Sequence, residues 1–249
     1  MPLAANPFAP QGAPAFAMCG SVELRGYFGM PKEGLLSDDL AREAVRHYYA
    51  CVTFVDAQIG RVLAELDRLG LREKTIVILW GDHGWKLGEH GEWDKHTNFE
   101  IDANAPLIVS APGQRNAGRR CGALVEFVDV YPSLAELCGL PLPKHLEGIS
   151  FAPLLEDPER PWKKAAFSQY PRTTDEFGRL MGYSMRTERY RLTQWKKARD
   201  GETVAIELYD HQADPHENRN IAGRGETEAL LGELKAMAAA GWRGALPPR

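Results

Sequence analysis

A short, continuously apolar run that stops at a polar turn constrains the fold of this chain more than any other feature. Residues 75–80 are Thr-Ile-Val-Ile-Leu-Trp, and Gly-Asp-His-Gly follows at 81–84. β-Branched residues without polar alternation are typical of a strand buried on both faces of a largely parallel sheet. Because ligands bind beyond the carboxyl ends of such strands, Asp82 and His83 are candidate site residues.

The segments around this strand predict a doubly wound α/β fold. Apolar residues recur at helical spacing from 40 to 69; Ser37 is suited to the N-cap and Gly70 to the end of that helix. A second buried strand is expected at 107–110 and a helix at 129–138. The succession helix, strand, loop, strand, helix is typical of this fold class.

The pattern changes after about residue 160. Strand-like pieces and a closing helix predict a smaller, mainly antiparallel subdomain with a terminal helix. The expected strands are 165–169, 181–186, 190–195 and 206–209, and the expected helix is 226–240. We therefore divide the chain into an irregular segment (1–36), an α/β portion (37–160) and the small subdomain (161–249).

Composition excludes several partners. The 249 residues carry a formal net charge of −4 with both signs interspersed, so neither nucleic acid nor an anionic membrane is an expected partner. No run is long enough to cross a membrane, and the first basic residue is Arg25, so no secretory leader is apparent and the compartment stays open. The four cysteines form no C-x-x-C pair of the kind that binds zinc.

The residue types after the strand suit oxyanion chemistry. The carboxylate of Asp82 is a hard ligand for a divalent cation, and the imidazole of His83 can ligate a metal or hydrogen-bond an anion. The ammonium of Lys95 suits the charge that develops on a sulfate or phosphate ester during cleavage. Taken alone, however, Asp-His-Gly is equally typical of an ordinary turn with a capping aspartate.

The longer string is more specific. Residues 80–95, Trp-Gly-Asp-His-Gly-Trp-Lys-Leu-Gly-Glu-His-Gly-Glu-Trp-Asp-Lys, resemble the second signature region of sulfatases of the iduronate-2-sulfatase type, within the alkaline-phosphatase-like superfamily. The resemblance continues over most of the chain from about residue 37. Its other segments are 48–61, 129–134, 167–172, 181–187, 190–195 and 207–210.

This resemblance implies roles for five residues. Asp82 and His83 would contact a Ca²⁺ ion or the sulfate around it, and His83 and Lys95 would act on the sulfate ester. Trp85 and His90 would line the substrate pocket, although both also suit simple loop packing. The implied fold is an incomplete alkaline-phosphatase-like sheet. Arg172 and Arg186 are expected to be surface charges rather than contacts to a uronate carboxylate.

Two elements of the family pattern are missing from these residues. The family uses a formylglycine made in a Cys-x-Pro-Ser-Arg type motif and a paired-aspartate metal site after another strand. No cysteine here has that context, Ser110-Ala-Pro-Gly-Gln lacks the arginine, and Asp38-Asp39 opens a helix. We therefore expect a C-terminal sulfatase portion that works with an N-terminal sulfatase segment and is inactive alone.

Three functions remain open from the sequence. The first is hydrolysis of a sulfated small molecule or sulfated saccharide. The second is a metal-dependent phosphodiesterase or phosphonate monoester hydrolase, which would use Mn²⁺ or Zn²⁺ with the same residue types. The third is a non-catalytic binding module, which the missing nucleophile motif favours.

Overall fold

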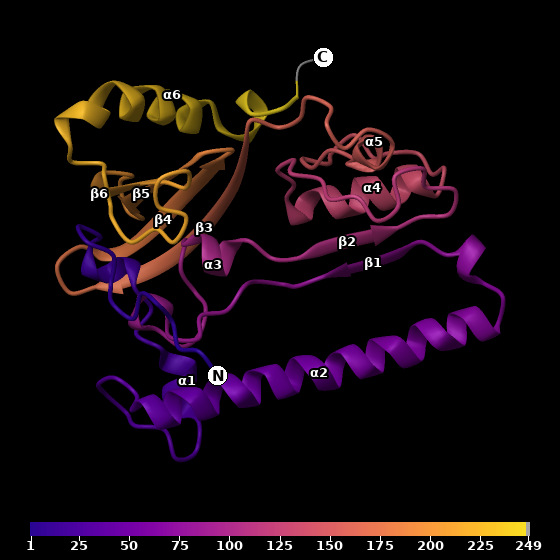
Figure 1. Cartoon of the computed structure of the whole chain (residues 1–249). Coiled ribbons are helices and arrows are strands. Elements are labelled where there is room, and N and C mark those ends of the chain that lie inside the picture. Colours follow the sequence, from indigo (N-terminus) through magenta and orange to yellow (C-terminus); the bar gives the residue numbers. More distant parts are fainter. Residues whose placement is uncertain (248–249) are drawn as a thin grey trace.

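The computed structural model describes residues 1–247 and has a mixed α/β architecture, as expected (Figure 1). The helices are α1 (Val22–Gly26), α2 (Asp38–Arg68), α3 (Glu100–Ala103), α4 (Val130–Leu137), α5 (Ala152–Glu156) and α6 (Glu228–Gly244). The strands are β1 (Val77–Trp80), β2 (Leu107–Ser110), β3 (Ala165–Thr174), β4 (Gly178–Thr187), β5 (Tyr190–Lys197) and β6 (Thr203–Asp210). None of the helices in this part of the chain is long and apolar enough to cross a membrane.

Helix α2 begins and ends where its local sequence predicts. The Ser37 side chain caps it by accepting a hydrogen bond from the Leu40 amide. At the other end Gly70 has a φ of 66°, and the Leu71 amide donates to the Leu66 carbonyl. This Schellman arrangement provides hydrogen-bond donors for the last carbonyls of the helix. It requires a positive φ, which glycine adopts without a steric penalty.

Strands β1 and β2 correct one expectation. They pair with each other in antiparallel register, from Val77 opposite Ser110 to Trp80 opposite Leu107. Helices α4 and α5 cover one face of this pair, whereas the side chains of Trp80 and Ile108 are exposed. The prediction of a largely parallel sheet buried on both faces is therefore wrong for residues 1–247, because the connection between the strands folds back on itself and only one face is covered.

The C-terminal sheet confirms the expected antiparallel strands and extends each of them. Its order is β3-β4-β5-β6, with every neighbour antiparallel. Helix α6 packs on one face through Leu234, against the buried Leu192 and Leu208 (Figure 1). On the other face, the buried Trp195 packs with Phe16 of the N-terminal segment and lies in one cluster with Phe99. Residues 1–36, expected to be irregular, thus contribute α1 and part of this core.

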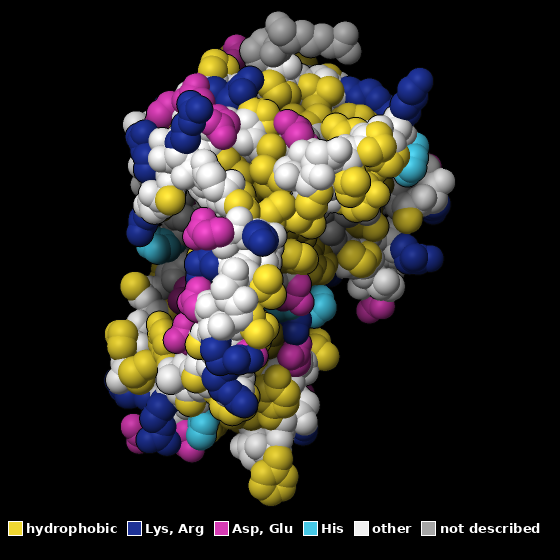
Figure 2. Space-filling model, turned by 90° about the vertical axis from the view of Figure 1, so that its right-hand side faces the viewer, with side chains coloured by type: hydrophobic (Ala, Val, Ile, Leu, Met, Phe, Trp, Pro, Cys, Tyr) yellow, Lys and Arg dark blue, Asp and Glu magenta, His cyan; other side chains and the backbone are white. Residues whose placement is uncertain are grey.

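Much apolar surface stays uncovered. Only Ala41 and Val45 of α2 are buried, close to its N-terminal end. The large apolar side chains that remain exposed include Val52, Phe54, Val55 and Val62 of α2, Leu69 directly after it, and Val128, Tyr131 and Leu140 near α4. Figure 2, a view of the right-hand side of Figure 1, shows hydrophobic side chains gathered into a band across the molecule. Apolar side chains gathered on one face are typical of a surface that another segment or protein covers.

Candidate functional site

The candidate site lies on the connection between β1 and β2, residues 81–106, which we call the site loop. Its two limbs run back along each other through successive backbone hydrogen bonds of 2.8–3.0 Å. The donor and acceptor residues are Gly81 with Pro106, Gly84 with Asp102, Lys86 with Asp94, and Gly88 with Glu92. The loop is therefore an ordered platform attached to the end of β1.

Gly84 is the point of closest approach within this platform. A Cβ atom built on Gly84 would lie 1.8 Å from the Ile101 carbonyl oxygen, a distance that no side chain tolerates. The contact brings the limb that carries Asp82 and His83 against α3. Glycine at this position thus has a packing reason that is independent of turn geometry.

Asp82 and His83 lie where β1 ends, as expected. The Asp82 side chain is 85% exposed, and its Oδ2 lies 3.5 Å from His83 Nε2. His83 Nδ1 donates to the Gly84 carbonyl at 2.7 Å, which leaves Nε2 on the side of the carboxylate. Both groups therefore face the same small region.

These two residues fit part of a calcium site. Asp82 offers hard oxygens, but Ca²⁺ takes about six to eight oxygen ligands. Within residues 1–247 no cluster of three or more His, Cys, Asp or Glu side chains suits a metal ion. The remaining ligands would be water, backbone oxygens or side chains of another segment.

Lys95 and Trp85 complete this region. The Lys95 ammonium lies 4.5 Å from the Trp85 ring centroid and forms an ion pair with Glu23 of α1. The Trp85 ring centroid is 6.2 Å from that of His83 and 6.0 Å from that of Tyr48, on which it stacks. His83, Lys95 and Tyr48 therefore lie around the Trp85 ring, and Asp82 lies beside His83.

His90 lies apart from this group. It is 3% exposed, its Nε2 donates to the His216 carbonyl at 2.8 Å, and its ring packs edge-on against Phe99 at 4.6 Å. Its amide also donates to the Asn6 carbonyl. These contacts match the packing role and give no support to a place in the substrate pocket.

A buried cluster of charged side chains within the site loop was not predicted from the sequence. Lys86 is fully buried, with its ammonium 2.5 Å from Asp102 Oδ2 and 3.4 Å from Glu92 Oε2. Glu92 Oε1 accepts from the amides of Cys19 and Gly20 at 2.6 and 2.7 Å. The cluster thus joins the loop to the N-terminal segment. A lysine between Trp85 and Leu87 carries no local signal that it is buried.

Cys19 is part of this junction, and its contacts predict how slowly its thiol reacts. Its thiol donates to Asp94 Oδ1 at 2.6 Å, and burial, together with the charge of Glu92, raises the pKa of the thiol well above its usual range. Since the thiolate is the reactive form, we expect iodoacetamide to modify Cys19 last, after the exposed Cys51, Cys121 and Cys138.

Peptide mass spectrometry during alkylation measures these rates. The same reaction in concentrated urea is the control, because unfolding should bring the four thiols to similar rates. Modification of Cys19 as fast as the exposed thiols in the native protein would contradict the buried contact with Asp94.

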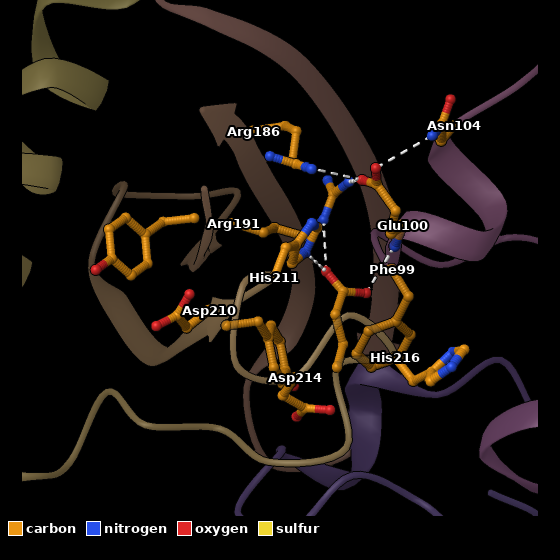
Figure 3. Close-up of polar contacts among 12 residues, drawn as sticks. Phe99, Glu100, Asn104, Arg186, Arg191, Asp210, His211, Asp214 and His216 are labelled. Atoms are coloured by element: carbon orange, nitrogen blue, oxygen red, sulfur yellow. Dashed lines mark hydrogen bonds and ion pairs between the residues drawn. The ribbon is translucent and has the colours of Figure 1, made fainter. Parts of the chain in front are cut away.

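A second network holds the far limb of the loop to the C-terminal sheet (Figure 3). Glu100, at the start of α3, pairs with Arg186 at 3.1 Å and with the buried Arg191, and its amide donates to Glu217 at 2.6 Å. Arg191 and His211 also bind Glu217, each at 2.8 Å. Burial opposes ionisation of Glu100, but the two arginines outweigh it and lower its pKa.

The two arginines expected at the surface are therefore structural. Arg186 is engaged by Glu100, and the half-buried Arg172 donates to backbone carbonyls of three segments. The acceptors of Arg172 are Phe16, Ala17, Met18, His96 and Pro171. The expectation of ordinary surface charges is wrong for both, because each guanidinium also binds a group that lies at least 76 positions away in the sequence.

Comparison with known proteins identifies the family. The family model described as sulfatase matches residues 1–140, and that of the N-sulphoglucosamine sulphohydrolase C-terminal region matches residues 88–240. The chain belongs to the sulfatase family. Mouse (Mus musculus) iduronate 2-sulfatase is 32% identical to this sulfatase chain over an alignment 267 positions long, which covers 81% of the chain and 48% of that protein.

Solved structures agree with the alkaline-phosphatase-like fold class. A structure in complex with its substrate D-glucosamine-2-N,6-O-disulfate superposes with a TM-score of 0.74 at 31% identity, covering 86% of this chain and 44% of that one. A phosphonate monoester hydrolase from Silicibacter pomeroyi superposes with a TM-score of 0.67 at 28% identity, covering 78% and 39%. The chain spans about half the length of the relatives it matches.

Proposed function

We propose that this chain supplies the metal- and sulfate-binding residues of a sulfuric ester hydrolase. The observation that carries the proposal is the position of His83 and Lys95 beside the Trp85 ring, with Asp82 next to His83, after the end of β1. The exposed carboxylate, the imidazole and the ammonium are the groups that an oxyanion site needs. Membership of the sulfatase family supports sulfate as the oxyanion.

Each residue has a distinct task in this proposal. Asp82, with His83 beside it, would hold a divalent cation, Ca²⁺ in our assignment, which when bound supplies positive charge to the ester oxygens. The ammonium of Lys95 donates to a sulfate oxygen and stabilises charge that grows as the ester bond breaks. The face of Trp85 limits where Lys95 can lie and offers an apolar surface to the substrate.

We place the nucleophile on another sulfatase segment. The 249 residues contain no Cys-x-Pro-Ser-Arg type motif. The uncovered apolar face of α2 and the exposed side chains of β1 and β2 are the surfaces that we assign to this partner segment. The chain alone is accordingly expected not to hydrolyse sulfate esters.

A sulfated saccharide is the substrate class that we favour. The structural relative described above is complexed with a disulfated glucosamine, and another relative is an iduronate 2-sulfatase. The aromatic pair Tyr48 and Trp85 beside Lys95 suits the apolar face of a sugar ring. Which sugar carries the sulfate is left to experiment.

Replacement of Lys95 by alanine tests the anion site directly. Loss of one charge-assisted hydrogen bond is expected to weaken methyl sulfate binding about 10- to 100-fold. The affinity can be followed by NMR titration of the Trp85 indole in calcium-containing buffer, because this ring lies under the ammonium. Lys74→Ala, at an exposed position, is the matched control. Unchanged affinity in Lys95→Ala would remove the basis of the proposal.

Two other functions keep specific support. Likeness to a phosphonate monoester hydrolase favours a phosphoryl substrate, for which methyl phosphonate and Mn²⁺ or Zn²⁺ should bind better than methyl sulfate and Ca²⁺. The absence of the nucleophile motif favours a non-catalytic binding module. Binding of sulfated saccharide with no turnover, even after addition of a nucleophile-bearing sulfatase segment, would support the module.

A further inference from the structure

An acidic side chain already occupies the position beside Lys95. Glu23 comes from α1, 72 positions away in the sequence, and its carboxylate pairs with the Lys95 ammonium. The Tyr27 hydroxyl donates to the other carboxylate oxygen, Oε1, at 3.1 Å. The Lys95 side chain is 15% exposed and that of Glu23 is 35% exposed, so solvent and ligands can reach the pair. The hydrogen bond from Lys95 lowers the pKa of Glu23, which keeps the carboxylate ionised at neutral pH.

This pairing changes what the site presents to an anion. A ligand oxyanion that approaches Lys95 also approaches Glu23, and its repulsion from the carboxylate grows with its own charge. Arg172 cannot offset that charge freely, because its guanidinium is bound to backbone carbonyls. The nearby Asp94 is engaged as well, because it accepts a hydrogen bond from the Cys19 thiol.

Sulfate and phosphate monoesters differ in this respect. A sulfate monoester carries one negative charge near neutral pH, whereas a phosphate monoester carries close to two above its second pKa of about 6. The two esters have the same tetrahedral shape and the same kind of acceptor oxygens. Charge is therefore the property by which the pair of Lys95 and Glu23 can separate them.

We propose that Glu23 is a specificity-determining residue that disfavours doubly charged phosphate monoesters and leaves singly charged sulfate monoesters as ligands. The inference rests on the proposed function, in which Lys95 binds the ester oxyanion. It goes beyond that function because it assigns the choice between the two oxyanions to a residue of the N-terminal segment.

Three small ligands separate the effect of ligand charge on binding from the effect of ligand shape. Methyl sulfate and dimethyl phosphate each carry one negative charge, and methyl phosphate carries two at about pH 8. We expect Glu23→Gln to improve binding of methyl phosphate about fivefold relative to methyl sulfate, the effect of one interaction between partly exposed charges. Dimethyl phosphate should follow methyl sulfate. NMR titration of the Trp85 indole measures all three affinities.

Two further variants control the experiment. Glu33→Gln makes the same charge change at an exposed position of the same segment and should leave the ligand ratios as they are. Glu23→Asp keeps the negative charge and should retain the preference for methyl sulfate. Methyl sulfate binding is the common reference for both variants. If they bind this ligand as the wild-type chain does, the N-terminal segment is still folded.

The outcomes distinguish this inference from the function on which it rests. If Lys95→Ala loses methyl sulfate binding while Glu23→Gln leaves the ligand ratios unchanged, the anion site stands and the role of Glu23 is overturned. An equal gain for all three ligands would also overturn it, because the effect would then not depend on ligand charge. If none of the ligands binds the wild-type chain, both proposals fall.

Discussion

Alanine at position 84 is expected to disrupt the site loop more than any other single methyl group added to it. The new Cβ would lie 1.8 Å from the Ile101 carbonyl oxygen and 2.8 Å from its carbonyl carbon. Both atoms belong to the backbone of α3, so no flexible side chain can move aside. We expect a loss of about 3 kcal/mol in the free energy of unfolding, at the upper end of what overpacking costs.

Urea denaturation and methyl sulfate titration check this prediction together. The substitution should also weaken methyl sulfate binding, because the limb of the loop that carries His83 must move away from α3. Gly122→Ala is the matched control, since nothing lies within 4 Å of a Cβ atom at that glycine. A Gly84→Ala variant as stable as Gly122→Ala would show that the two limbs are not packed as closely as the structure describes.

Replacement of Lys86 by methionine is the second substitution with a large expected effect. The ammonium is fully buried between Asp102 and Glu92, and methionine leaves both carboxylates buried without their cation. Removing one partner of a buried ion pair costs about 3–5 kcal/mol of stability. The N-terminal segment should loosen as well, since Glu92 also binds the amides of Cys19 and Gly20.

A double-mutant cycle sharpens this test. Adding Asp102→Asn to Lys86→Met removes one of the two buried carboxylate charges that have lost their cation, and should recover part of the lost stability. Lys144→Met, at an exposed position, provides the control for the loss of a lysine. Faster alkylation of Cys19 in Lys86→Met would report the loosened segment independently. Full additivity of the two substitutions would contradict the direct pair of Lys86 and Asp102.

Three residues, Gly84, Lys86 and Glu100, explain how a surface loop becomes a precise site. Lys95 reaches the candidate oxyanion position from a loop of 26 residues, 81–106, that has only the short helix α3 as regular helix. Gly84 closes one side of that loop on α3, Lys86 anchors its underside, and Glu100 binds it to the C-terminal sheet. Charged groups held in this way lose little freedom when a ligand binds.

The local sequence determined the secondary structure and part of the candidate site. The cap at Ser37, the Schellman end at Gly70 and the alternation of strands after residue 165 each depend on residues within a few positions. The same is true of Asp82 and His83, which must lie together because they are adjacent after β1. Lys95 was predicted from the signature string and lies beside Trp85.

Only the tertiary structure decided the rest, because those contacts join residues that no local pattern relates. The antiparallel pairing of β1 with β2 depends on how the site loop folds back, and hydrophobic runs carry no information on strand direction. Glu23, the ion-pair partner of Lys95, lies 72 positions away, and all the acceptors of Arg172 except Pro171 lie at least 76 positions away. A charged side chain looks the same in sequence whether it faces water or a buried partner, so the burial of Lys86 and the position of Glu23 beside Lys95 emerge only when distant segments pack together.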